Sequence, residues 1–313
     1  MANGNKINTP DPYFLEVAER CQQKVAADPV YQAAIKKTLA MADKNSQAFV
    51  RESVSEIKTE LAKIPKQEQQ SFSFLPTELT RLSPFFPMSK AEMGNRPFEK
   101  HTFENAWGTM EIQGERLAVF DESVLLAILK LATINKSFTF TTTFNEILFI
   151  MGTTAGKNTY AAVLSSLSRL TGTKIALTIK SKDGKKTGLV NTILSGAKFD
   201  KYNLKISINE YFGQMYLEGF VTSINLNFRA QLKGDITKAM YRFYEGQPIN
   251  FEIHMDKLCS AINLDSSQPK FKIRQLINKS LKELLEHKFF EYGKINKKDH
   301  VVTKKAEMSL KRI

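Results

Sequence analysis

The order of predicted elements after Trp107 occurs twice, and this repetition constrains the fold more than any other feature of the sequence. In the first copy, "DESVLLAILKLA" predicts a helix, "FTFTTTF" a short strand and "NEILFIMG" a short helix that ends at Gly152. A longer helix is predicted from Asn158 to Leu170. In the second copy, "GDITKAMYRFYEGQ", "NFEIHM", "DKLCSAINL" and "PKFKIRQLINKSLKELLEHKFF" predict the same four elements.

The spacing between the copies is nearly constant. Asp121 and Asp235, which we expect to cap the first helices, lie 114 residues apart. The two strands begin 112 residues apart, and the long-helix lysines Lys157 and Lys270 lie 113 residues apart. Because one offset fits every element, we predict a structural duplication, although the two copies have low sequence identity.

Each copy ends in a predicted β-hairpin. The first is "KIALTIKSKDGKKTGLVNTIL", with Asp183 and Gly184 at its turn, and the second is "EYGKINKKDHVV". Helix, strand, helix, longer helix and two-stranded wing is the order of the winged-helix version of the helix-turn-helix. In that fold the third helix enters the major groove, and the wing lies along the backbone or minor groove.

We therefore predict an α+β protein with two tandem winged-helix domains behind a helical extension. Residues 1–75 form the extension and linker, because Asp28 and Pro29 are a helix-start pair and "SQAFVRESVSEIKTELAKI" carries a one-sided apolar stripe. Residues 76–230 form the first winged-helix domain, with dimerisation and backbone contacts. Residues 231–313 form the second, which we expect to read most of the DNA sequence.

The charge of the chain predicts a polyanionic partner. The net charge is +13 and the pI is near 9.5, which is typical of proteins that bind nucleic acid or an acidic membrane. From Ser266 to Ile313 there are 13 Lys/Arg and five Asp/Glu, so most of the surplus lies at the C-terminal end. A charge run of this kind can also be only a solvated face. The charge surplus lies beside the second long helix and hairpin, and this position favours double-stranded DNA as the partner.

The two long helices have predicted outward faces that coincide at an offset of 113. In the first helix the core side is expected to be Tyr160, Val163, Leu164, Leu167 and Leu170. In the second it is expected to be Ile273, Ile277, Leu281 and Leu284. At this offset Ala162 aligns with Gln275, Ser165 with Asn278, Ser166 with Lys279, and Arg169 with Lys282.

Four groups of side chains are predicted to contact DNA. Gln and Asn can pair with the edge of adenine, while Lys and Arg contact guanine or neutralise phosphates. The candidates are Lys157, Asn158, Ser165, Ser166 and Arg169 in the first long helix; Lys180, Lys182, Lys185 and Lys186 in the first hairpin; Lys270, Lys272, Arg274, Gln275, Asn278, Lys279 and Lys282 in the second long helix; and Lys294, Lys297 and Lys298 in the second hairpin.

The stretch "GTTAGKNTY" offers an alternative, a nucleotide-binding loop. Gly152 and Gly156 are one residue too close for that motif, and Asn158 stands where Ser or Thr should follow Lys157. We expect the two glycines to bend the chain between two helices, and Lys157 with nearby amides to hold one DNA phosphate.

No feature of the sequence predicts an enzyme, a cofactor or a metal site. The four histidines lack paired metal spacing, and the two cysteines, Cys21 and Cys259, lack a CxxC arrangement. The longest strongly apolar run, "LLAILKLA", is too short to span a bilayer, and the N-terminus lacks the apolar stretch of a signal peptide. We therefore expect a cytoplasmic protein with no membrane partner and no small-molecule substrate.

Four phrases resemble theta-type plasmid replication initiators of the RepA/TrfA kind, in particular the RepA proteins of IncW-like plasmids. They are "LSPFFPMSK", "WGTMEIQGERLAVFDESVLLAILKLA", "GDITKAMYRFYEGQP" and "KFKIRQLINKSLKELLEHKFFEYGKI". The resemblance covers about Leu75 to Lys304 and leaves the N-terminal helices unmatched.

The resemblance implies a function and partners. Such initiators bind repeated origin sequences (iterons) as monomers, help to open the origin, and repress their own promoters as dimers. They recruit the host replicative helicase and often the host initiator. The resemblance also implies that Trp107 to Ala132 is part of a dimer surface, with monomer and homodimer in equilibrium. A winged-helix transcriptional repressor without an initiation role is the alternative.

Overall fold

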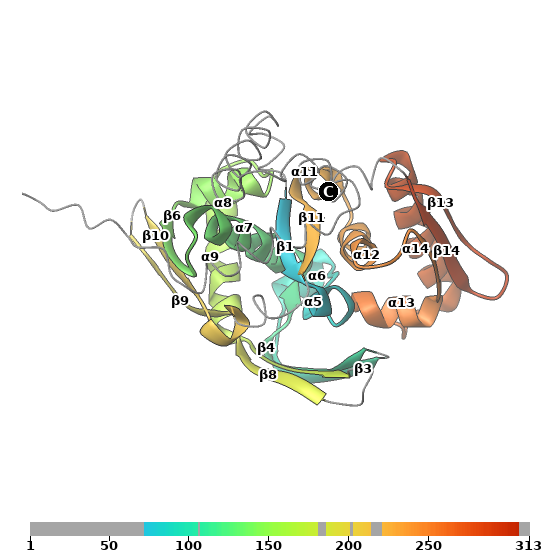
Figure 1. Cartoon of the computed structure of the whole chain (residues 1–313), viewed down its shortest axis with the longest axis horizontal. Helices are drawn as coiled ribbons and strands as arrows, with labels where there is room; N and C mark the ends of the chain where they lie inside the picture. Colours follow the sequence, from blue (N-terminus) through green and yellow to red (C-terminus); the bar gives the residue numbers. More distant parts are fainter. Residues whose placement is uncertain (1–71, 106, 181–185, 201–202, 214–220, 307–313) are drawn as a thin grey trace, which may run out of the picture.

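The computed structural model describes residues 72–105, 107–180, 186–200, 203–213 and 221–306 (Figure 1). The helices predicted before residue 72 lie outside these ranges. The first described element is the strand β1 (Phe72–Pro76). No helix within the described ranges is long and apolar enough to cross a membrane.

Two units of the chain repeat one order of elements. The first unit comprises α7 (Val119–Asn135), β6 (Thr139–Thr142), α8 (Phe144–Ile150), α9 (Lys157–Gly172), β9 (Leu194–Phe199) and β10 (Leu204–Ile208). The second unit comprises α12 (Asp235–Glu245), β12 (Asn250–His254), α13 (Met255–Ile262), α14 (Lys270–Glu286), β13 (Phe290–Ile295) and β14 (His300–Lys305). The order of helix, strand, helix and longer helix predicted for both copies is the order observed.

Each unit closes with a three-stranded sheet of the same topology. The strand orders are β6-β10-β9 and β12-β14-β13, so in both units the last hairpin strand pairs with the strand that precedes the short helix. All of these pairs are antiparallel. The pairing fixes the hairpin beside the long helix of its own unit.

The predicted first wing belongs to a different sheet. β7 (Lys174–Lys180) and β8 (Lys186–Thr192) do form a hairpin, but β7 pairs with β4 (Gly108–Glu115), and β4 pairs with β3 (Phe98–Asn105). The resulting order is β3-β4-β7-β8. The hairpin equivalent to β13–β14 is β9–β10. The long helices begin 113 residues apart, at 157 and 270, whereas the equivalent hairpins begin only 96 apart, at 194 and 290. The assignment of β7–β8 as the wing is therefore wrong, because this hairpin is an insertion.

The alignment of the long helices differs by one residue from the predicted one. The buried residues of α9 are Val163, Ser166, Leu167 and Leu170, and those of α14 include Ile277, Ser280, Leu281 and Leu284. These sets coincide at an offset of 114. Ser166 is thus the counterpart of Ser280 rather than of Lys279.

The two units share one core. The buried hydrophobic residues form a single cluster that extends from Leu75 to Val301. The remaining elements lie at the junction: β1 pairs with β11 (Val221–Asn225), and β2 (Phe85–Phe86) pairs in parallel with β5 (Leu117–Ala118). The short helices there are α5 (Thr77–Arg81), α6 (Lys90–Gly94) and α11 (Leu226–Gln231).

Buried ion pairs at the start of α7 connect both units. The Asp121 carboxylate accepts hydrogen bonds from Arg96 Nη1 at 2.9 Å and from Arg169 Nη2 at 2.7 Å. Its neighbour Glu122 contacts Arg229 Nη2 at 3.2 Å and Arg242 Nη1 at 2.7 Å, and Arg242 lies on α12 of the second unit. Both acidic side chains are fully buried, so they fix several elements in place at once.

One sequence prediction at this helix needs correction. Asp121 is not the cap residue, because α7 begins at Val119 and the Asp121 carboxylate instead accepts the N–H of Ala118. The prediction that Trp107 to Ala132 is part of a dimer surface stays a prediction. Most residues of α7 from Val119 to Ala132 are buried inside the chain, and β4 has a partner strand on each side.

Candidate nucleic-acid interface

The helix α14 is amphipathic in the way its sequence predicts. Pro269 stands at the cap position, and its carbonyl accepts the N–H groups of Lys272 and Ile273. Proline is well suited to this end of a helix because the first N–H groups have no partner within the helix. The helix runs for 17 residues to Glu286 and packs its apolar side on the core of the second unit.

The outward side of α14 carries the predicted polar and cationic side chains. Lys272, Gln275, Asn278, Lys279 and Lys282 are all exposed, as predicted. Phe271, for which the sequence pattern gives no separate signal, is exposed beside them. These six residues are called the α14 face below. The strong apolar period of Ile273, Ile277, Leu281 and Leu284 is what made this face predictable.

Lys270 and Arg274 serve the hairpin as well as the helix. Lys270 Nζ lies 2.6 Å from Asp299 Oδ2, and Arg274 Nη1 donates to Asp299 Oδ1. Asp299 is in the β13–β14 turn, with a positive φ of 59°. Hydrogen bonding from Lys270 lowers the pKa of the Asp299 carboxyl, and the same contact raises the pKa of Lys270. These two cations therefore hold the hairpin against the helix and are partly neutralised.

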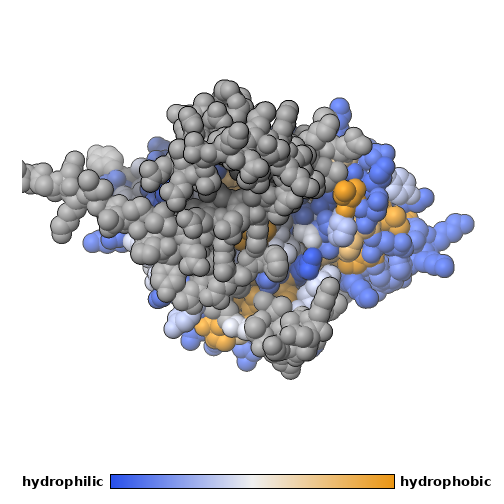
Figure 2. Space-filling view, in the orientation of Figure 1, coloured by the Kyte–Doolittle hydropathy of each residue, from blue (hydrophilic) through white to orange (hydrophobic). Residues whose placement is uncertain are grey.

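The second hairpin presents further lysines to solvent. Lys294, Lys297 and Lys298 are exposed, and Lys294 Nζ lies 5.2 Å from the centre of the Tyr292 ring. The Asn296 Oδ1 atom accepts the N–H groups of Lys298 and His300, which shapes the turn. In Figure 2, hydrophilic residues cover most of the surface at this end of the molecule.

The first unit matches the prediction at only part of α9. Lys157, Asn158 and Ser165 are exposed. Ser166 is fully buried, because it lies on the side of the helix that packs on the core with Val163 and Leu170. The prediction that it faces DNA is wrong.

Arg169 and Leu164 also differ from the prediction. Both the Nε and Nη2 atoms of Arg169 bond to Asp121, and the side chain is 12% exposed, so it supports the fold rather than facing a partner. Leu164, expected in the core, is exposed. It lines a hollow of about 570 Å³ with Phe144, Tyr160 and Phe199, so the neighbourhood of α9 is largely apolar.

The lysines predicted for the first wing are not placed beside α9. Lys182 and Lys185 lie outside the described residues. Lys180 and Lys186 pair with each other at the end of β7–β8, and their side chains are outside the described part of the structure. The hairpin that carries them belongs to the four-stranded sheet, not to the sheet of the first unit.

The loop between α8 and α9 is a bend rather than a nucleotide-binding loop. The helix α8 precedes it, where a nucleotide-binding loop would follow a strand. Gly152 has a φ of +65°, and a Cβ atom there would lie 2.8 Å from that of Ala230. The Thr159 hydroxyl donates to the Gly156 carbonyl at 2.8 Å. The positive φ of Gly152 and the Thr159 hydrogen bond both serve the turn into α9.

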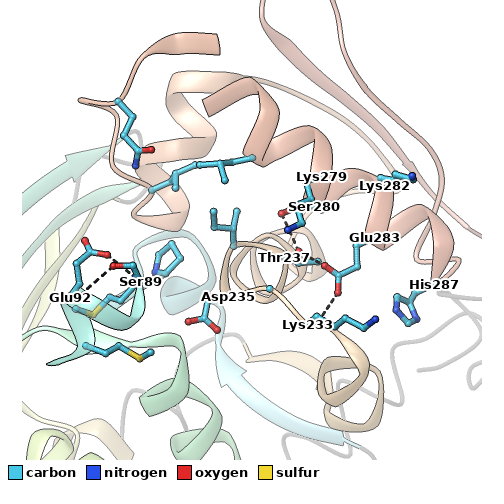
Figure 3. Close-up of a pocket in the computed structure, with 18 of the residues that line it drawn as sticks. Ser89, Glu92, Lys233, Asp235, Thr237, Lys279, Ser280, Lys282, Glu283 and His287 are labelled. Atoms are coloured by element: carbon cyan, nitrogen blue, oxygen red, sulfur yellow. Dashed lines mark hydrogen bonds between the residues drawn. The ribbon is translucent and has the colours of Figure 1, made fainter. Parts of the chain in front are cut away.

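A cavity of about 830 Å³ flanks α14, where the second unit meets the residues around Ser89 (Figure 3). Lys279 and Lys282 lie at one side of it. Glu283 points toward α12, where its carboxylate accepts the Thr237 hydroxyl at 2.7 Å and the Lys233 N–H at 2.6 Å. At the 114-residue offset Glu283 is the counterpart of Arg169. Both residues fasten a long helix to the start of the first helix of its unit.

The described residues contain no group of three or more His, Cys, Asp or Glu side chains that could hold a metal ion. Cys259 is buried and free, and burial raises the pKa of its thiol to about 12. It is therefore protonated and unreactive near neutral pH.

The fold and the α14 face define a class of protein: a chain with two tandem copies of a three-helix unit, of which the second exposes a cationic helix beside a cationic hairpin. The sequence model of Replication initiator protein A matches residues 82–283, which is more than half of the chain. The chain belongs to the Replication initiator protein A family. The matched region includes all of α9 and most of α14, and it ends at residue 283, before the second hairpin.

Two solved structures of domains 2 and 3 of RctB are similar to this chain. One has 10% sequence identity and a TM-score of 0.51, and the alignment covers 76% of this chain and 100% of that one. A selenomethionine form has 12% identity and a TM-score of 0.49, with 74% and 98% of the two chains covered. The first of these supports a shared fold. A search among curated proteins gave no match.

Proposed function

We propose that the chain is a plasmid replication initiator that binds repeated double-stranded DNA sites (iterons) at the origin. The observation that carries the proposal is the α14 face: every polar or cationic residue assigned to it is exposed, on one helix, beside a hairpin that exposes Lys294, Lys297 and Lys298. Membership of a replication initiator family supports a DNA-binding role for this face.

In the proposed complex both units act as winged helices. The helix α14 lies in the major groove, where Gln275 and Asn278 can each form two hydrogen bonds with adenine. Lys272, Lys279 and Lys282 contact guanine or neutralise phosphates. The hairpin β13–β14 lies along the backbone with Lys294, Lys297 and Lys298. The fixed link of Asp299 to Lys270 and Arg274 sets the hairpin at one angle to the helix.

The first unit has a smaller part in this proposal. Its helix α9 exposes Lys157 and the N–H groups of its first turn, which suit one phosphate. The exposed residues that follow are uncharged, so we assign this unit, as residues 76–230, to backbone contact and dimerisation. Residues 231–313 read most of the sequence.

We propose that the protein acts by binding DNA and not by catalysing a reaction. No catalytic group is assigned, and the described residues offer no metal cluster. We propose that monomers on adjacent iterons help to open the origin and recruit the host helicase and initiator. Dimers in equilibrium with these monomers would repress the gene's own promoter.

A footprint on the plasmid that carries the gene tests the proposal. The expected result is protection that repeats about every 20 base pairs, or two helical turns, beside an A·T-rich stretch. Protection of a single promoter palindrome, together with normal copying of the replicon after deletion of the gene, would instead indicate a repressor.

A further inference from the structure

Phe271 is a large apolar side chain that α14 leaves in solvent, with an exposed fraction of 73%. It is the second residue of the helix. Gln275, Asn278 and Lys282 follow it on the same side at spacings of four, seven and eleven residues. A single exposed phenylalanine is common on protein surfaces, but this one stands at the start of a cationic face.

The neighbours of Phe271 leave its ring uncovered. Lys270 and Arg274 are drawn toward Asp299 in the hairpin turn, and Lys272 is exposed on the other flank. None of the ring–ring or cation–ring contacts found among the described residues involves Phe271. Lys270 and Arg274 support the hairpin, but Phe271 does not, so this structural role does not explain why position 271 is aromatic.

We propose that Phe271 is a specificity-determining residue that packs against the C5-methyl group of thymine in the major groove. The inference rests on the proposed function. The first residues of a reading helix contact base edges, and phenylalanine is among the side chains that make apolar contact with the thymine methyl group. Removal of this apolar surface from water favours the contact, and a base without the methyl group offers less surface. The α14 face then reads adenine with its amides and thymine with its ring.

Replacement of thymine by deoxyuridine, which lacks only the methyl group, tests the contact. The full-length chain first selects its preferred duplex from a random pool, and each thymine of that duplex is then replaced in turn. For the wild-type chain, affinity should fall about three- to tenfold at one or two positions, since one buried methyl group is worth about 0.8 kcal/mol or more. Phe271→Ala should lose a similar factor on the thymine duplex and should show no further loss with uracil at those positions.

Two variants complete the experiment. Phe271→Leu keeps an apolar group and should retain part of the preference for thymine. Phe149→Ala removes a phenylalanine of similar exposure, 77%, from the first unit and should leave every thymine effect unchanged. Circular dichroism and thermal melting check that each variant is folded.

The outcomes separate this inference from the proposed function. Sequence-specific binding in which no thymine methyl group matters, or in which Phe271→Ala keeps the wild-type response at every position, overturns the role of Phe271 alone. A wild-type chain that selects no sequence at all overturns both.

Discussion

The long helices α9 and α14 occupy the same place in two units of the same topology, but they expose different chemistry. At the 114-residue offset, Lys272, Lys279 and Lys282 of α14 replace Asn158, Ser165 and Ser168 of α9, and Gln275 and Asn278 replace Ala161 and Leu164. The core-facing positions are alike, with Ser166 and Ser280 buried at the same point. The duplicated fold therefore needs only the inner face, and the outer face is free to differ.

This difference explains why topology alone does not assign a function. Both units place a long helix beside a three-stranded sheet, yet only the second combines a cationic helix with a hairpin that exposes Lys294, Lys297 and Lys298. The first unit presents Leu164 and Phe199 near its helix instead. Function follows the site rather than the fold.

The largest expected effect concerns the stability of the fold, and it tests whether the buried ion pairs of Glu122 join the two units. Glu122→Ala leaves Arg229 and Arg242 buried without their carboxylate, and the free energy of unfolding should fall by about 3–5 kcal/mol. Chemical denaturation measures the change. Glu111→Ala, which removes a surface pair with Lys100, is the control and should cost less than about 1 kcal/mol. Equal losses would contradict the structural role of the buried pairs.

The next effect concerns the charge of the α14 face. Replacement of Lys272, Lys279 and Lys282 by Gln should weaken DNA binding by about a hundredfold near physiological salt and reduce the slope of log affinity against log salt by about three. The matched control replaces Lys100, Lys136 and Lys174, which removes the same net charge elsewhere. A similar loss in both triple variants would show that net charge, and not the α14 face, drives binding.

A smaller effect distinguishes base-specific contacts from electrostatic attraction to the DNA backbone. Gln275→Ala or Asn278→Ala should cost about 1–3 kcal/mol on the preferred duplex and relax preference at one base, with little change in the salt slope. Leu164→Ala, at the position equivalent to Asn278, should leave the base preference as it is. Binding titrations on the preferred and altered duplexes measure both. If Lys279→Ala and Gln275→Ala change sequence preference alike, the proposed orientation of the helix is wrong.

The smallest effect concerns Lys270. Because this side chain already pairs with Asp299, Lys270→Ala should weaken DNA binding less than Lys279→Ala does, by about twofold against several-fold. Titration of one duplex with both variants gives the ratio. A larger loss for Lys270→Ala would mean that its ammonium group leaves Asp299 for a phosphate.

The sequence predicted α14 better than α9 for a physical reason. Four large apolar residues at Ile273, Ile277, Leu281 and Leu284 define the inner side of α14 without ambiguity. In α9 the serines give no signal of burial, so the sequence pattern predicts an outward position for the buried Ser166. It also predicts that Arg169 faces solvent, because its partner, Asp121, is distant in the sequence.

The sheet partner of a hairpin is harder to predict than the hairpin itself. The turn residues Asp183 and Gly184 correctly indicated a hairpin between β7 and β8. The local sequence pattern gives no information about the pairing of β7 with β4. The paired residues Ile112 and Ile175, for example, lie more than sixty residues apart in the sequence. The local pattern therefore predicts the wrong strands for the wing of the first unit.

Photo-crosslinking from equivalent positions tests the central claim most directly. A benzophenone amino acid is placed at Gln275 in one variant and at Ala161 in the other, two exposed positions that the 114-residue offset equates. On the preferred duplex, the account predicts crosslinks to bases from position 275 and few or none from position 161. Base crosslinks from position 161 that equal or exceed those from position 275 would contradict it.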